Sequence, residues 1–173
     1  RVAIVTGAGQ GVGEGIARRL AQEGVTVVVA ARRAETGQPV VESIRAAGGQ
    51  AVCIVTDVSV SESVDACVAS TVQQFGRLDI MVHNAFMGGI PHKLEKAQIE
   101  KHWTSMSRTG VWASLFCARA AMPHLITSSA RPQGEGGGRL ILITSPSGVE
   151  GSANIPLYSP AKAGQRAIAK SLA

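Results

Sequence analysis

The chain has 173 residues, of which 45% are hydrophobic and 17% are charged, and 20 are glycine. This size and composition exclude an intrinsically disordered segment and fit one globular domain with a substantial buried core. No apolar run approaches the about 20 residues that a membrane-spanning helix needs, so we expect no membrane partner. The formal net charge is +5, but the basic residues are mostly scattered and only 3% of the residues are aromatic. This pattern favours a basic, solvated surface over a nucleic-acid-binding one.

The three cysteines, Cys53, Cys67 and Cys117, form no CxxC pair and cannot all be paired with one another. They are typical of small apolar side chains in a reducing compartment rather than of a disulfide framework. The N-terminus shows no basic and apolar leader, so we expect no secretory signal and a cytoplasmic protein. No metal site is predicted.

Short apolar runs alternate with segments of helical periodicity along the chain. Strands are predicted at residues 2–6, 25–31, 51–56, 78–82 and 139–144. Helices are predicted at residues 11–23, 35–47, 59–75, 97–126 and 157–173, and loops at 85–91 and 127–138. A capping box between Ser59 and Glu62 is expected to open the third helix. Because the strands are continuous apolar runs, the order predicts an α/β fold in one domain spanning 1–173: a Rossmann-like, doubly wound parallel sheet with helices on both faces.

The first predicted strand runs into a turn with glycines at TGxxxGxG spacing, namely Gly7, Gly11 and Gly13. At such a turn, backbone amides and the positive N-terminus of the next helix can bind a pyrophosphate, and glycine allows the close approach. The spacing is not GxGxxG, because Val12 and Glu14 occupy the third glycine position of that motif. The alternative is a tight turn without a ligand. The residues predicted to form the phosphate site are Gly7, Gly9, Gln10, Gly11, Val12 and Gly13.

Two arginines follow the second predicted strand. In dinucleotide-binding units an acidic residue about 20 positions after the glycines binds the ribose 2′-hydroxyl, whereas an arginine accommodates a 2′-phosphate. Counting from Gly11 leads to Ala31, which is followed by Arg32 and Arg33 and by no acid. Because a guanidinium binds phosphate through two donors, this favours NADP(H), with NAD(H) as the alternative. The two arginines could also form a solvated turn, and Gln10 stands where a second basic group would help.

Tyr158 and Lys162 are four residues apart in a predicted helix and therefore share one face. An ammonium group beside a phenol favours the phenolate, which suits Tyr158 to proton exchange with a carbonyl or alcohol oxygen. Pro160 between them fits the first turn of the helix. Ser145 lies 13 residues before Tyr158, just after the fifth predicted strand.

Together these motifs resemble those of the short-chain dehydrogenases/reductases (SDRs), a family of NAD(P)-dependent oxidoreductases, over the whole chain. The resemblance rests on the glycine turn, Asp57-Val58 after the third strand, Asn84-Ala85 after the fourth, Ser145, and Tyr158-x-x-x-Lys162. It implies hydride transfer between NADP(H) and a small-molecule carbonyl or alcohol, as in a ketone or aldehyde reductase, or a 3-oxoacyl-reductase-like enzyme.

The resemblance also implies a role for each residue. Tyr158 would be the catalytic acid in reduction and the base in oxidation, and Ser145 would hold the substrate oxygen. Lys162 would bind the nicotinamide ribose and act on Tyr158. Asp57, with Val58, would contact the adenine, and Asn84, with Ala85, would lie near the cofactor ribose.

Three features depart from the family pattern. The usual NNAG after the fourth strand is His83-Asn84-Ala85-Phe86 here. We expect His83 to serve structure, whereas Phe86 either opens the loop or lines the substrate cleft. Ser107 replaces the asparagine that supports the proton relay in the family. The chain also ends before the last strands of the family fold, so we expect the domain to be C-terminally incomplete.

By resemblance, the fourth and fifth long helices pair across a two-fold axis, which implies a homodimer or homotetramer. Met106, Val111, Leu115 and Ala118 could form that face, or could equally be ordinary core. The rival interpretation is a dinucleotide-binding module without turnover, such as a redox sensor or a structural partner.

Overall fold

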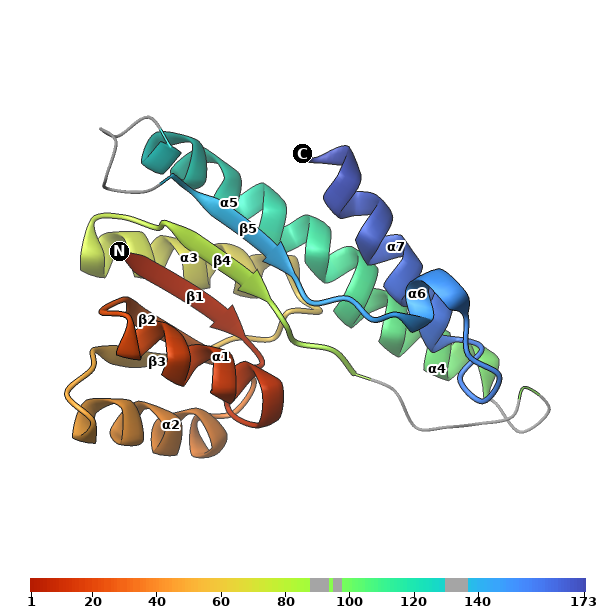
Figure 1. Ribbon diagram of the computed structural model, residues 1–173, viewed down its shortest axis with the longest axis horizontal. Coiled ribbons are helices and arrows are strands. Elements are labelled where there is room, and N and C mark those ends of the chain that lie inside the picture. Colours follow the sequence, from red (N-terminus) through yellow and green to blue (C-terminus); the bar gives the residue numbers. More distant parts are fainter. Residues whose placement is uncertain (88–93, 95–97, 130–136) are drawn as a thin grey trace.

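A parallel sheet forms the centre of the fold in the computed structural model, which describes residues 1–87, 94, 98–129 and 137–173 (Figure 1). Its strands are β1 (Val2–Thr6), β2 (Thr26–Ala31), β3 (Ala51–Val55), β4 (Ile80–His83) and β5 (Arg139–Leu142). They lie in the order β3-β2-β1-β4-β5, and every neighbouring pair is parallel. This architecture confirms the predicted doubly wound α/β fold.

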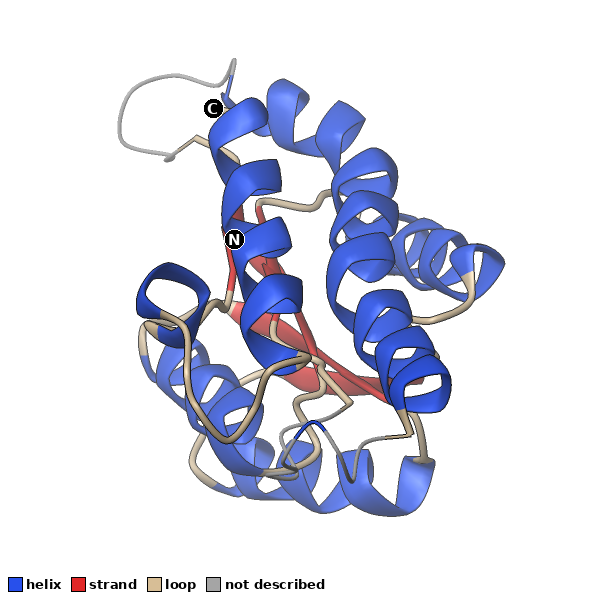
Figure 2. Cartoon of the chain, turned by 90° about the vertical axis from the view of Figure 1, so that its right-hand side faces the viewer, coloured by secondary structure: helices blue, strands red, loops and turns tan. Residues whose placement is uncertain are grey.

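Helices cover both faces of the sheet (Figure 2). They are α1 (Gly11–Gln22), α2 (Ala34–Ala46), α3 (Ser61–Phe75), α4 (Ile99–Ser107), α5 (Ala113–Ser129), α6 (Ser147–Glu150) and α7 (Tyr158–Ser171). Helices α1 and α2 pack on one face, and α3 and α5 pack on the other, with α7 beside α5. The short helix α6, which periodicity did not predict, packs against α7.

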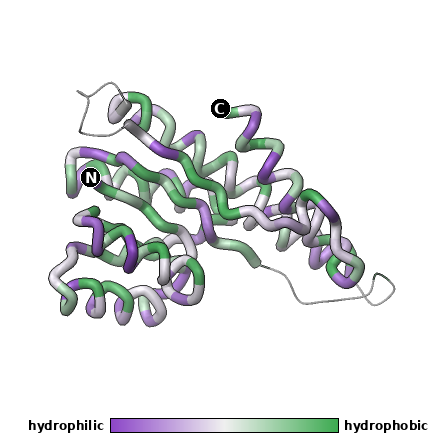
Figure 3. Tube along the Cα trace, in the orientation of Figure 1, coloured by the Kyte–Doolittle hydropathy of each residue, from purple (hydrophilic) through white to green (hydrophobic). Residues whose placement is uncertain are grey.

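Each face of the sheet has its own apolar core. Side chains alternate along a strand, so Ala3 and Val5 of β1 face α1 and α2, while Ile4 between them faces α3 and α5. All three are fully buried. The central strands are mainly apolar in Figure 3, as expected for strands covered on both sides.

The capping box predicted at Ser59 and Glu62 is wrong. Helix α3 begins at Ser61, and no side chain caps its first turn. Instead the Ser59 hydroxyl donates to Asp57 Oδ1 at 2.7 Å, and the Asp57 amide donates to Ser63 Oγ at 3.0 Å. The aspartate competes for the serine and closes a local turn between β3 and α3, as short polar side chains commonly do.

The helix predicted at 97–126 is interrupted by a π-helical turn at Arg108–Trp112 and extends to Ser129. Residue Ala97 lies outside the described residues, as do 88–91 of the first predicted loop and 130–136 of the second. Glycine weakens the helix at Gly110, and π-helical turns allow a carbonyl to leave the regular hydrogen-bond ladder. Here the Thr109 carbonyl bonds to His83 instead.

Two of the four apolar residues considered for subunit contacts belong to the core of this chain. Met106 and Ala118 are buried, whereas Leu115 is 43% exposed. Association between copies of the chain stays a prediction.

Candidate active site

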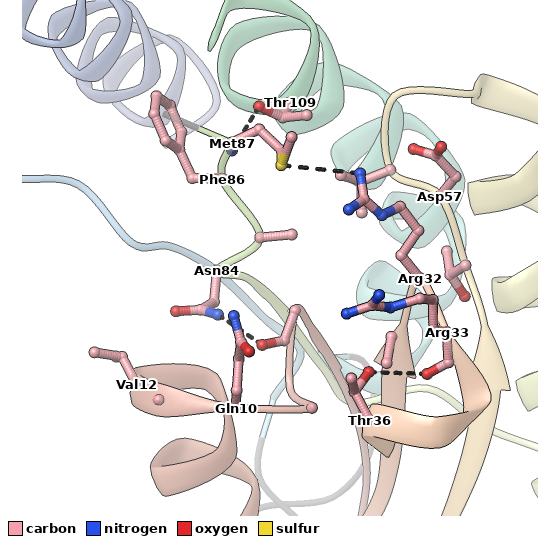
Figure 4. Close-up of a pocket in the computed structure, with 17 residues that line it drawn as sticks. Gln10, Val12, Arg32, Arg33, Thr36, Asp57, Asn84, Phe86, Met87 and Thr109 are labelled. Carbon is pink, nitrogen blue, oxygen red and sulfur yellow. Dashed lines mark hydrogen bonds between the residues drawn. The ribbon is translucent and has the colours of Figure 1, made fainter. Parts of the chain in front are cut away.

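A cavity of about 340 Å³ opens at the carboxyl ends of β1, β2, β3 and β4 (Figure 4). From β1 the chain builds the sheet outward first through β2 and β3, and then on the other side through β4 and β5. Open α/β sheets bind ligands in the crevice that this change of direction leaves at the carboxyl ends of the strands. Most of the residues predicted to bind a cofactor line it. They are Gly7, Gly9, Gln10, Gly11, Val12, Arg32, Arg33, Asp57, Val58, Asn84 and Ala85.

Gly13 lies behind the cavity and does not line it. A Cβ atom at this position would collide with Asn84 Nδ2 and with the Gly7 carbonyl. That amide nitrogen donates to the carbonyl of Thr6 at 3.0 Å and, more weakly, to that of Gly7 at 3.4 Å. Gly13 therefore allows α1 to pack against the end of β4, and Asn84 holds the glycine turn in place.

The N-terminus of α1 is suited to a pyrophosphate. Gly7 and Gly11 have φ of 65° and 57°, a left-handed conformation that favours glycine. No side chain caps the first turn of the helix at Gln10, so its amides remain free of a side-chain oxygen. Together with the helix dipole, these amides form an anion site whose geometry fits the dinucleotide predicted from the glycine spacing.

The two arginines lie on the β2 side of the cavity, and both are exposed. The Arg32 guanidinium is turned toward Met87, with Nη1 at 3.8 Å from the sulfur, while that of Arg33 points toward the side on which Gln10 lies (Figure 4). Thr36, in the first turn of α2 and beside Gly9, donates its hydroxyl to the Arg33 carbonyl at 2.9 Å. The two guanidinium groups are donors that fit a phosphate.

A buried network joins the ends of β1 and β4. His83 Nε2 lies 3.1 Å from the Thr109 carbonyl, and its Nδ1 lies 3.1 Å from Thr6 Oγ1. Because a carbonyl oxygen only accepts, Nε2 carries the proton and the Thr6 hydroxyl donates to Nδ1. The same Thr6 oxygen accepts the amides of Asn84 and Ala85, each at 3.1 Å. His83 therefore positions this segment, as expected, and it is fully buried.

Tyr158 and Lys162 share one face of α7, and Lys162 Nζ lies 5.7 Å from the centre of the tyrosine ring. Lys162 is buried, and its Nζ donates to the Ile143 carbonyl at 2.8 Å. Burial lowers the pKa of Lys162 to about 8. The bond to Ile143 attaches α7 to the end of β5, two residues before Ser145.

Ser145 lies in the turn between β5 and α6. Its Oγ accepts the amide of Ser147 at 3.2 Å, which leaves the hydroxyl proton able to donate to another oxygen. Ser107, by contrast, donates its hydroxyl to the Thr104 carbonyl of its own helix at 3.2 Å.

Sequence reasoning missed several residues that line the cavity, namely Ala31, Thr36, Thr56, Met87 and Thr109. Thr36 follows the arginine pair closely and could have been found from that position. Thr109 could not, because it reaches the end of β4 through the π-helical turn and through its bonds to His83 and to the Met87 amide, the latter at 2.9 Å.

The comparisons with known proteins agree with this geometry. The sequence model of the short chain dehydrogenases matches residues 1–173. The chain belongs to the short-chain dehydrogenase family. Its members are NAD(P)-dependent oxidoreductases that act on small molecules, and this membership supports an enzyme rather than a module without turnover.

Several individual proteins are similar to this SDR. It is 34% identical over 172 residues to an uncharacterized oxidoreductase of Staphylococcus aureus (strain MRSA252), covering 99% of this chain and 70% of that one. It is 34% identical to a hydroxynaphthalene reductase of Aspergillus fumigatus, covering all of this chain and 60% of the reductase. A crystal structure of a metagenomic short-chain oxidoreductase in complex with NADP matches with a TM-score of 0.89 and 31% identity, covering 100% of this chain and 75% of that one.

Two kinds of feature are absent from the described residues. They contain no helix that is both long enough and apolar enough to cross a membrane. They also contain no group of three or more His, Cys, Asp or Glu side chains that could hold a metal ion.

Proposed function

We propose that this SDR uses NADP(H) to reduce a ketone or aldehyde to an alcohol, and to catalyse the reverse oxidation. The observation that carries the proposal is the placement of Lys162. Its buried ammonium group is held at the end of β5 by the Ile143 carbonyl, on the same helix face as Tyr158. A fixed cation beside a phenol favours proton release from that phenol.

NADP(H), when bound, supplies or accepts the hydride at the carbonyl carbon. In reduction, the Tyr158 hydroxyl gives its proton to the carbonyl oxygen and becomes a phenolate, which solvent then reprotonates. In oxidation, the phenolate takes the proton from the alcohol. Lys162 stabilises the phenolate in both directions, and the Ser145 hydroxyl donates a hydrogen bond to the substrate oxygen.

The preference for NADP(H) over NAD(H) is supported by the cavity wall formed after β2. Arg32 and Arg33 line it, and no acidic side chain stands at the strand end to bind a ribose 2′-hydroxyl. The similar metagenomic oxidoreductase was crystallised with NADP. Asp57 and Val58 line the same cavity beyond β3, where the adenine is expected.

The experiment that tests the proposal replaces Tyr158 by phenylalanine. We expect Tyr158→Phe to lower kcat for NADPH-dependent carbonyl reduction by about 10²–10⁴-fold, because proton transfer is lost. Binding of NADPH, followed by its fluorescence, should change little. Turnover that survives the substitution would contradict the mechanism, and a failure of the wild-type chain to bind NADPH would contradict the cofactor assignment.

A further inference from the structure

Phe86 occupies a position between the cavity and the proposed catalytic pair. It follows β4 by three residues and lines the cavity. Its ring lies edge-on to that of Tyr158, with the ring centres 5.3 Å apart and the planes at 83°. This is a favourable aromatic geometry.

The face of the same ring lies under the Lys162 ammonium group. Lys162 Nζ is 4.1 Å from the centre of the Phe86 ring, nearer than the 5.7 Å that separates it from the centre of the Tyr158 ring. Both distances lie within the about 6 Å over which a cation is attracted to a ring face. An ammonium group has three donors, of which the Ile143 carbonyl accepts one. The ring face supplies a second favourable contact where Lys162 is only 4% exposed, and such contacts are stronger away from water.

The π-helical turn makes room for this ring. A Cβ atom at Gly110 would lie 2.6 Å from Phe86 Cε2, so any other residue at 110 would displace the ring. Met87, the residue after Phe86, is also fixed, because its backbone amide donates to Thr109 Oγ1 at 2.9 Å. The ring therefore follows a segment fixed after β4 and fits against Gly110 of the π-helical turn.

We propose that Phe86 is a positioning residue, whose ring face holds the Lys162 ammonium group beside Tyr158. Its role in catalysis rests on the proposed function, but its contact with Lys162 does not. Phe86 lines the cavity, in keeping with one of the two expectations for it, and has this further role. It takes part in placing the proton-transfer pair.

Tyr158, through its ring, and His83, through its charge interaction, are titratable groups near Lys162. Tyr158 lies on the same helix, and His83 lies on β4. Burial, together with the charge of Lys162, holds the pKa of His83 at about 4, so the imidazole is neutral at pH 7. Burial lowers the pKa of Lys162 itself to about 8. The ring of Phe86 opposes this effect, because it stabilises the cation and not the neutral amine.

The direct test is the pKa of Lys162, measured by NMR titration of the chain without cofactor, labelled with ¹³C at lysine Cε. The Lys162 signal is assigned by its absence in Lys162→Arg. We expect Phe86→Leu, which keeps an apolar side chain but removes the ring, to lower this pKa by about 1. Phe86→Tyr keeps the ring and should leave the pKa near the wild-type value. Phe116→Leu, which removes a ring that contacts Trp112, is the matched control and should leave it unchanged.

The kinetic test uses the same variants with NADPH and a carbonyl substrate. We expect Phe86→Leu to lower kcat by about tenfold and to move the alkaline limb of the pH profile by about one pH unit toward lower pH. The affinity for NADPH should stay within about threefold, and Phe86→Tyr should restore the wild-type profile. Thermal unfolding of each variant reports whether it folds, and Phe86→Met replaces Phe86→Leu if the leucine variant does not.

An unchanged Lys162 pKa in Phe86→Leu, or equal changes in Phe86→Leu and Phe86→Tyr, would overturn the proposal. If the wild-type chain reduces no carbonyl substrate, the proposed function fails, while the NMR comparison still decides whether Phe86 holds Lys162.

Discussion

The His83 imidazole and the Thr109 carbonyl, 3.1 Å apart, join the end of β4 to the π-helical turn between α4 and α5. The bond satisfies one ring nitrogen of this buried histidine, while burial and the charge of Lys162 keep the imidazole neutral at pH 7. The other ring nitrogen of His83 bonds to Thr6, just before the glycine turn. The imidazole therefore connects the glycine turn to the π-helical turn.

This relationship predicts that His83 makes stability depend on pH. Burial, followed by the charge of Lys162, lowers the pKa of His83 from 6.5 to about 4. Between these two values the unfolded chain binds more protons than the folded one, so stability falls as the pH falls through this range. We expect the His83 contribution to decrease by about 2 kcal/mol between pH 7.5 and pH 5.

Urea unfolding at the two pH values measures this change. In His83→Asn, which cannot be protonated in this range, the corresponding decrease should disappear. His124→Asn, at a partly exposed position on α5, is the control, and this variant should show the same decrease in stability as the wild-type chain. An identical pH dependence in the wild-type chain and in His83→Asn would show that His83 does not titrate as described.

A second prediction concerns Asp79, which is fully buried just before β4. Its carboxylate accepts the Val2 amide at 2.7 Å and Arg77 Nε at 2.7 Å, and also accepts the Ser128 hydroxyl of α5. Burial alone would raise the pKa of Asp79, but these hydrogen bonds outweigh burial and lower the pKa to about 2. The stability that Asp79 contributes is therefore present above about pH 4 and is lost as the pH falls toward 2.

Asp79→Asn should lower the free energy of unfolding at pH 7 by about 2 kcal/mol, because it leaves Arg77 and the amide of β1 without their charged acceptor. The matched control is Asp65→Asn, which removes an exposed ion pair with Arg119 and should cost less than about 1 kcal/mol. Equal losses in the two variants, measured by urea unfolding at pH 7, would contradict this interpretation of Asp79.

A third prediction tests the assignment of the 2′-phosphate site. Arg32→Ala should weaken NADPH binding by about tenfold while changing NADH binding little, because only NADPH carries the 2′-phosphate. Isothermal titration with both cofactors measures the two affinities. Arg19→Ala, which removes an exposed ion pair with Glu23 on α1, should affect neither. Equal weakening of both cofactors by Arg32→Ala would count against the assignment, and Arg33→Ala provides an independent comparison.

Much of the fold could be predicted from the sequence, because strands and helices leave patterns in short stretches of neighbouring residues. The apolar runs and helical periodicity predicted each strand and the order of the long helices. Boundaries were less accurate. The Ser59 hydroxyl bonds to Asp57 and does not form the expected capping box. The helix around Gly110 contains a π-helical turn that periodicity does not reveal.

The sequence by itself determined the fold class, the glycine turn and the candidate catalytic residues, since those motifs depend on short spacings and on the chemistry of single side chains. Only the tertiary structure decided what Phe86 contacts. Its ring meets Tyr158 and Lys162, which are more than 70 residues away along the chain, because α7 begins at the edge of the sheet where β4 ends. Contacts of this kind depend on the packing of distant elements, and no local pattern encodes them.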